Sequence, residues 1–149
     1  MNLNDQSFRK LAKRKFIKTL KYKPVSENEL SKIIVDCCFR IHKKLGPGLL
    51  ESVYEEVLAY ELRKQNISFK RQQGIPVIYD ELTMDIGFRA DIIVEDKVII
   101  EIKSVELIAP VNQKQVITYL RLTDLKLGLL VNFNNSLIKK GMQRIVNNL

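Results

Sequence analysis

Hydrophobic residues recur along the chain with a helical period in some stretches and with a strand period in others. In the first half, apolar side chains return every three or four positions until the breaker Gly46-Pro47-Gly48 interrupts them. This pattern predicts a helix that begins at the capping box of Ser26 and Glu29, and a second helix over residues 49–64. Residues 111–122 show the same period and predict a third helix of this kind.

Strand-like segments fill the middle of the chain. Runs rich in β-branched residues over 74–79, 82–94 and 98–102 predict a three-stranded antiparallel meander. Pro76 predicts an edge position or a bulge in the first strand, and Gly87 predicts a kink in the second.

The order of these elements predicts the fold class. The apolar run 127–133 is too hydrophobic for the surface and predicts a central strand, and one last element ends at Leu149. The order is therefore helix, three strands, helix and strand, with two extra helices ahead of it, the first of which is an amphipathic helix predicted within residues 1–23. We expect an α/β (α+β) protein with a mixed central sheet flanked by helices, in which residues 24–149 form a single domain.

The hairpin over residues 89–103 contains the most informative chemistry. If its turn centres on Asp96, antiparallel pairing places Ile93 opposite Ile99, Asp91 opposite Glu101 and Arg89 opposite Lys103, all on one face. Two carboxylates in directly opposed positions repel each other, and this part of the sheet is expected to be buried.

Buried carboxylates of this kind need a cation. Lys103 supplies one positive charge, and a divalent metal with oxygen ligands, of the kind Mg²⁺ prefers, would supply the rest. A break of local rules without compensation is typical of a functional site. The alternative is that Glu101 and Lys103 lie on an ordinary solvated strand face.

The net charge of +8 is concentrated at the N-terminus. Residues 1–23 carry eight basic residues against one acid, Asp5, so this segment accounts for +7 of the total. Apolar residues recur among them at helical spacing, which predicts a basic amphipathic extension. We expect it to contact the nucleic-acid backbone through Arg9, Lys10, Lys13, Arg14, Lys15 and Lys18. An anionic membrane surface, a solvated helix or a frayed terminus are the alternatives.

Other functional classes are disfavoured by composition. Cys37 and Cys38 are adjacent on a helical stripe, where they are expected in the core, and neither has metal-ligand spacing. His42 is the single histidine, which disfavours a zinc site and leaves little basis for a Ser-His-Asp triad. No apolar run reaches the length of a membrane span, and a reducing cytoplasm is expected.

Several short motifs resemble those of a known group. Gly48-Leu49-Leu50-Glu51-Ser52-Val53-Tyr54 is similar to the motif that names the GxxExxY proteins, a mostly bacterial group of the PD-(D/E)xK nuclease superfamily. The resemblance covers residues 33–147, and further matching positions are Gln72, Asp91, Glu101-Ile102-Lys103, Gln115, Tyr119-Leu120 and Asn132-Phe133. It implies a restriction-endonuclease-like core and a metal-dependent nuclease that acts on DNA or RNA.

The resemblance also implies roles for particular residues. Asp91, Glu101 and the backbone carbonyl of Ile102 are expected to hold Mg (or Mn). Lys103 is expected to orient or deprotonate a water. Glu51 is expected to reach the metal directly or through water, while Gln115 and, as a weaker candidate, Gln72 would position water or phosphate.

One position departs from the family pattern, in which a histidine often lies three residues before the helical glutamine. Here that position is Asn112, so we expect an activity that is slower than that of relatives with the histidine, or altered from it. A non-catalytic module that binds nucleic acid or protein on the same fold is the main alternative, and a purely structural protein is a third. Because the superfamily often forms dimers, a homodimer is also expected.

Overall fold

A capping interaction begins the first helix of the computed structural model, which describes residues 24–149. Ser26 and Glu29 form the predicted capping box, with the Glu29 amide donating to Ser26 Oγ and the Ser26 amide donating to Glu29 Oε2. The elements are α2 (Glu27–Leu45), α3 (Glu51–Lys64), β1 (Phe69–Tyr79), β2 (Leu82–Val94), β3 (Val98–Lys103), α4 (Pro110–Thr123), β4 (Leu127–Asn132), the 3₁₀ turn η1 (Ile138–Gly141) and β5 (Met142–Val146).

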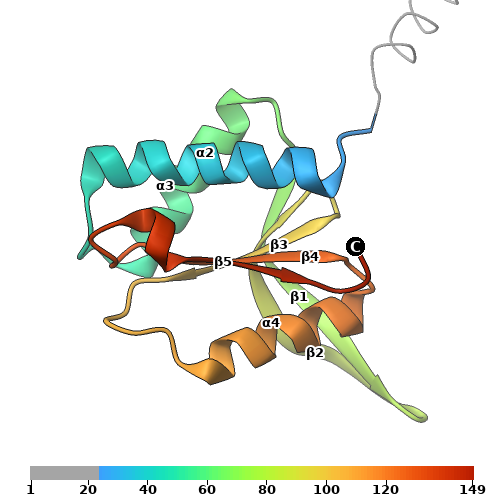
Figure 1. The fold of residues 1–149 in the computed structure, drawn as a ribbon. Helices are drawn as coiled ribbons and strands as arrows, with labels where there is room; N and C mark the ends of the chain where they lie inside the picture. The colour runs from blue at the N-terminus through green and yellow to red at the C-terminus, as the bar shows by residue number, and fades with distance from the viewer. Residues whose placement is uncertain (1–23) are drawn as a thin grey trace, which may run out of the picture.

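The five strands form one sheet in the order β1-β2-β3-β4-β5. All neighbouring pairs are antiparallel except β3 and β4, which are parallel and are connected through α4. The predicted meander, the mixed sheet and the interior position of the apolar strand β4 are therefore confirmed. Helices α2 and α3 cover one face of the sheet and α4 covers the other (Figure 1).

The alternation of side chains along β3 divides the core into two layers. Val98, Ile100 and Ile102 pack toward α2 and α3, whereas Ile99 packs with Val116 of α4. The period of two places Glu101 and Lys103 on the same side as Ile99. The larger layer also contains both cysteines, which are fully buried and unpaired, as expected from the helical stripe.

The long hairpin of β1 and β2 differs from the prediction in one respect. Strand β1 begins at Phe69 rather than at residue 74, because residues 69–73 pair with β2 despite their charged and polar composition. The predicted irregularity at Pro76 is confirmed by a register shift between Ile75 and Val77. A Cβ on Gly87 would lie 2.0 Å from Val77 Cγ2, so β2 needs glycine at this point.

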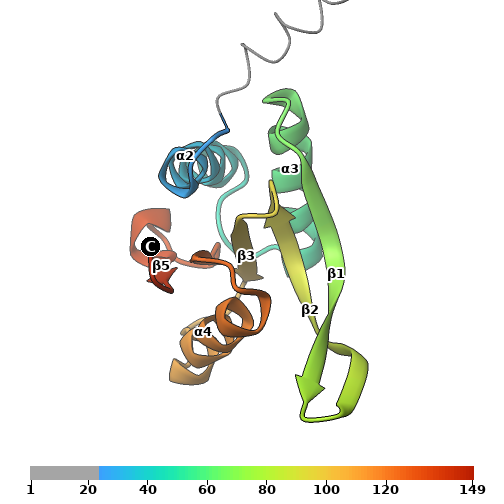
Figure 2. The same cartoon turned by 90° about the vertical axis from the view of Figure 1, so that its right-hand side faces the viewer.

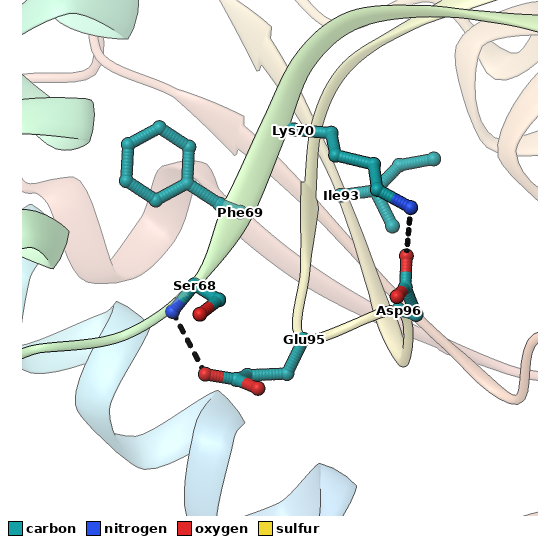
Figure 3. Close-up of a pocket in the computed structure, with 6 residues that line it drawn as sticks. All are labelled: Ser68, Phe69, Lys70, Ile93, Glu95 and Asp96. Atoms are coloured by element: carbon teal, nitrogen blue, oxygen red, sulfur yellow. Dashed lines mark hydrogen bonds and ion pairs between the residues drawn. The ribbon is translucent and has the colours of Figure 1, made fainter.

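Polar contacts join the start of β1 to the turn between β2 and β3. The Ser68 amide donates to Glu95 Oε1 at 2.7 Å, and Lys70 Nζ lies 2.7 Å from Asp96 Oδ1 (Figure 3). These residues line a small pocket of about 100 Å³ beside Ile93. Because the Lys70–Asp96 ion pair is exposed to solvent, we interpret this pocket as part of a surface turn and not as a binding site. No helix within residues 24–149 is long and apolar enough to cross a membrane.

The close approach of α4 to the sheet depends on Gly128. A Cβ at this position would lie 2.5 Å from Val116 Cγ1. Replacement Gly128→Ala is therefore expected to lower the free energy of unfolding by about 1–3 kcal/mol, because it overpacks this contact. The double variant Gly128→Ala/Val116→Ala should lose less than the sum of the two single losses in urea denaturation, since truncation of Val116 makes room for the new methyl group. Simple additivity would contradict this explanation.

Candidate functional site

The β2–β3 hairpin has the register that the sequence predicts near its turn. Ile93 pairs with Ile99, and the turn residues Glu95 and Asp96 both have positive φ, of 50° and 52°. Two such residues are typical of the tight turns that connect antiparallel strands. The ladder ends early, however, at the pair of Ile92 and Ile100.

Side chains replace the ladder where it stops. Asp91 Oδ2 accepts a hydrogen bond from the Ile102 amide at 2.8 Å, and the Asp91 amide donates to Glu101 Oε1 at 3.3 Å. The two predicted acidic residues are thus brought together, through exchanged contacts between side chain and backbone. The predicted ladder pairs of Asp91 with Glu101 and of Arg89 with Lys103 do not form, because the last pair of β2 and β3 is Ile92 with Ile100. Arg89 pairs with Gly74 on the other side of β2.

The two carboxylates perturb each other. Burial and the charge of Asp91 raise the pKa of Glu101 to about 8, although the Asp91 amide and Lys103 oppose the shift. Burial also raises the pKa of Asp91, against the opposing effects of the Ile102 amide, Gln72 and Lys103. When both groups are ionised, the site therefore carries negative charge that Lys103 only partly offsets.

Glu51 lies at the first turn of α3 and is tied to the end of β3. Its Oε1 accepts from the Ser104 amide at 3.2 Å, and Ser104 Oγ donates to the Leu49 carbonyl at 2.6 Å. The charge of Glu51 contributes to the raised pKa of Glu101, so these two acids interact electrostatically. Glu51 also borders a depression of about 630 Å³, whose lining residues are Gly48, Leu49, Leu50, Glu51, Ser52, Ser104 and Asn134.

Tyr54 explains why the motif spacing is needed. Its hydroxyl donates to the Gly46 carbonyl at 2.6 Å and accepts from the Leu49 amide at 3.2 Å, while its ring stacks on Phe133 at 4.3 Å between centroids. Gly48 has a φ of 97°, a conformation that favours glycine. Tyr54 thus holds the two ends of the loop 46–49 together, and this loop determines where α3 begins and where Glu51 lies.

A buried acid that the sequence pattern does not single out connects α3 to the hairpin. Glu55 accepts from Arg71 Nε at 2.9 Å and from Gln72 Nε2 at 2.8 Å. The same Gln72 nitrogen lies 3.3 Å from Asp91 Oδ1, so one amide serves both carboxylates. Glu55 is one turn after Glu51 on the same helix, which is the only signal in the sequence that could have indicated it.

Helix α4 brings a tyrosine near the acids. Burial and the charges of Glu101 and Asp91 raise the pKa of Tyr119, whose ring stacks on Phe88 at 3.8 Å between centroids. The predicted residue Gln115 is exposed one turn earlier. Asn112, the departure from the family pattern, accepts from the Ala109 amide at 3.1 Å and caps the helix.

The donor atoms of the acidic pair suit a hard cation. Within residues 24–149, no group of three or more His, Cys, Asp or Glu side chains is arranged to hold a metal ion. Mg²⁺ is commonly held by only one or two carboxylates, together with waters and substrate oxygens, so Asp91 and Glu101 fit it in kind and number. His42 has a different role, because its Nε2 lies 2.7 Å from the Asn135 carbonyl oxygen.

The comparisons with known proteins agree with this architecture. A family model for the PD-(D/E)XK nuclease superfamily matches residues 28–145, and the chain belongs to this superfamily. A solved structure titled "Crystal structure of SSO0001" is similar with a TM-score of 0.52 and 18% identity, over 95% of this chain and 78% of that one. At this identity it supports the restriction-endonuclease-like fold alone. The search of curated proteins found no match.

The raised pKa of Glu101 predicts a dependence of stability on pH. Because the folded pKa of about 8 lies above the ordinary value of 4.5, the folded state binds more protons than the unfolded state, and wild-type stability falls as pH rises between these values. Glu101→Gln removes this titration. Measured in EDTA, the free energy of unfolding of the variant relative to wild type should rise by more than about 1 kcal/mol between roughly pH 5 and pH 8.5. A constant difference would contradict the assignment.

Gln72 predicts an unusual order of stabilities. Its φ of 48° is left-handed although it lies in a strand. Both Gln72→Ala and Gln72→Gly lose the bonds to Glu55 and Asp91, but only glycine adopts this backbone without strain. The glycine variant should therefore be more stable than the alanine variant by about 1 kcal/mol in urea denaturation. The reverse order, which is usual in strands, would show that the backbone relaxes.

Proposed function

We propose that this protein is a metal-dependent nuclease that hydrolyses phosphodiester bonds of DNA or RNA. The observation that carries the proposal is the pair Asp91 and Glu101, two partly buried carboxylates at the broken end of a ladder with Lys103 on the next position of the same face. Membership of the nuclease superfamily supports the same reaction class.

The proposed ligands of Mg²⁺ (or Mn²⁺) are Asp91, Glu101 and the backbone carbonyl of Ile102. A divalent cation would relieve the repulsion that raises the pKa of Glu101, and its chemistry when bound is to polarise the scissile phosphate and acidify a water. The Ile102 amide and Gln72 hold Asp91 from two sides, so its carboxylate is oriented before any ligand arrives.

The other residues act on the water and on the phosphate. Lys103 orients the attacking water or accepts its proton, and its charge stabilises the additional negative charge of the transition state. Glu51 contacts the same region directly or through a water, from the depression at the start of α3. Gln115 positions water or phosphate from α4.

The substrate is proposed to be bound without recognition of its base sequence. Its backbone would also contact the basic residues of the N-terminal extension, which lie outside the described residues: Arg9, Lys10, Lys13, Arg14, Lys15 and Lys18. Such contacts weaken steeply with added salt.

The direct test is cleavage of end-labelled single-stranded and double-stranded DNA and RNA in Mg²⁺, Mn²⁺ or EDTA. Wild type should cut at least one substrate only when metal is present. Asp91→Asn and Lys103→Met should each lower the rate by about 100-fold or more, because they remove a metal ligand and the group that acts on water. Asp96→Asn and Lys70→Met, which alter the exposed pair at the turn of the same hairpin, should leave the rate unchanged.

A second measurement separates a lost activity from a lost site. Titration with Mn²⁺ should raise the melting temperature of wild type but not of Asp91→Asn, since a ligand that binds only the native state stabilises it. Absence of cleavage on every substrate, with nucleic-acid binding that survives Asp91→Asn, would refute the nuclease and favour a binding module on the same fold.

A further inference from the structure

The tip of the β1–β2 hairpin projects beyond the body of the protein (Figures 1 and 2). Many of its side chains are apolar and exposed. Residues 75–87 contain five large apolar residues with exposed fractions from 42% to 72%: Ile78, Tyr79, Leu82, Met84 and Ile86. The same segment carries three acids, Asp80, Glu81 and Asp85, and no basic residue.

Strand pairing places most of the apolar residues of the tip on one face, whereas Ile78 points to the opposite face. Tyr79 is opposite Leu82 and Val77 is opposite Met84, so these four side chains share one face. The core layer under α4 ends at Ile75 and Phe88 and does not extend to the tip. A face of this kind is typical of an interaction site.

The charge of the tip restricts its partner. Two such tips facing each other would bring six carboxylates together, so direct hairpin-to-hairpin association is disfavoured. A complementary surface must be apolar at its centre and basic at its rim.

The described part of the chain contains such a surface. A groove of about 570 Å³ lies between the C-terminal half of α2 and α3. Its apolar wall includes Leu45 and Tyr60, with exposed fractions of 42% and 57%. Its charged lining is Arg40, Lys43, Lys44, Lys64 and the single acid Glu61, a net charge of +3.

Two of these basic residues are available for new ion pairs. Glu61 is bound by Arg40 at 3.3 Å and by Lys64 at 3.4 Å. Lys43 and Lys44 have no acidic partner within ion-pair distance among residues 24–149. The net charge of +3 around the groove thus matches the three acids of the hairpin tip.

We infer that the hairpin tip of one copy of this chain docks into the α2–α3 groove of a second copy. A chain cannot fill its own groove in this way, because the tip and the two helices lie at opposite ends of the molecule in both views (Figures 1 and 2). Leu82, Met84 and Ile86 of the tip belong to β2, the strand that also carries Asp91, so association would restrain this strand at the end opposite to Asp91. This inference does not depend on the proposed nuclease activity.

Charge reversal tests the inference on the full chain. One variant, Asp80→Lys/Glu81→Lys, reverses the tip, and another, Lys43→Glu/Lys44→Glu, reverses the groove. Wild type should sediment as a dimer or larger assembly at micromolar concentration and low salt, and each variant alone should weaken association by about tenfold or more. An equimolar mixture of the two variants should associate again, because each altered tip then meets an altered groove and each unaltered tip meets an unaltered one.

Control measurements test whether the variants are folded and whether the effect depends on the position of the reversed charge. The substituted positions are exposed, so far-ultraviolet circular dichroism should show that both variants are folded. Their melting temperatures should fall by a few degrees, because Asp80 has a left-handed φ of 50° and acids in the last turn of α2 oppose the helix dipole. Association is therefore measured well below both melting temperatures. Glu106→Lys changes an exposed acid elsewhere and should not alter association. A monomeric wild type, or a mixture that stays monomeric, would overturn the inference. Loss of association in the tip variant but not in the groove variant would also overturn it, and would indicate another basic partner such as residues 1–23.

Discussion

The hydrogen bond from the Ile102 amide to the Asp91 carboxylate is the contact on which the candidate site depends. An ordinary hairpin would continue its ladder here, but the side chain of Asp91 takes the place of a backbone acceptor, and the Asp91 amide bonds to Glu101 in return. Two acids are therefore held close together at the edge of the core. Burial then makes their ionisation unfavourable, and perturbed pKa values of this kind are typical of functional sites.

Helices on both faces of the sheet contribute side chains around this pair. Helix α3 contributes Glu51 through Ser104, and Glu55 through the shared amide of Gln72. Helix α4 places Tyr119 near both acids from the other face of the sheet. Because each contact crosses between elements, a change in the packing of either helix would alter the geometry of the carboxylates.

Two residues with no direct role in the proposed chemistry organise the loops beside the site. Tyr54 bonds to both sides of the loop before α3. Asn132 is buried at the end of β4, where its amide group accepts from the Val105 amide at 3.0 Å and donates to the Val105 carbonyl at 2.8 Å. Both residues satisfy backbone groups that would otherwise be unpaired near the sheet edge, so the depression at Glu51 has defined walls.

Local rules were enough to predict the helix caps, the meander, the register of Ile93 with Ile99 and the superfamily, because periodicity, turns and motif order depend on neighbours in sequence. The same rules also predicted that Asp91 and Glu101 lie close together on the β2–β3 hairpin. Only the tertiary structure showed that Glu55 and Gln72 bridge α3 to Asp91, and that the tip of β1 and β2 is left uncovered. These features depend on how helices pack across both faces of the sheet, which side-chain alternation alone does not determine.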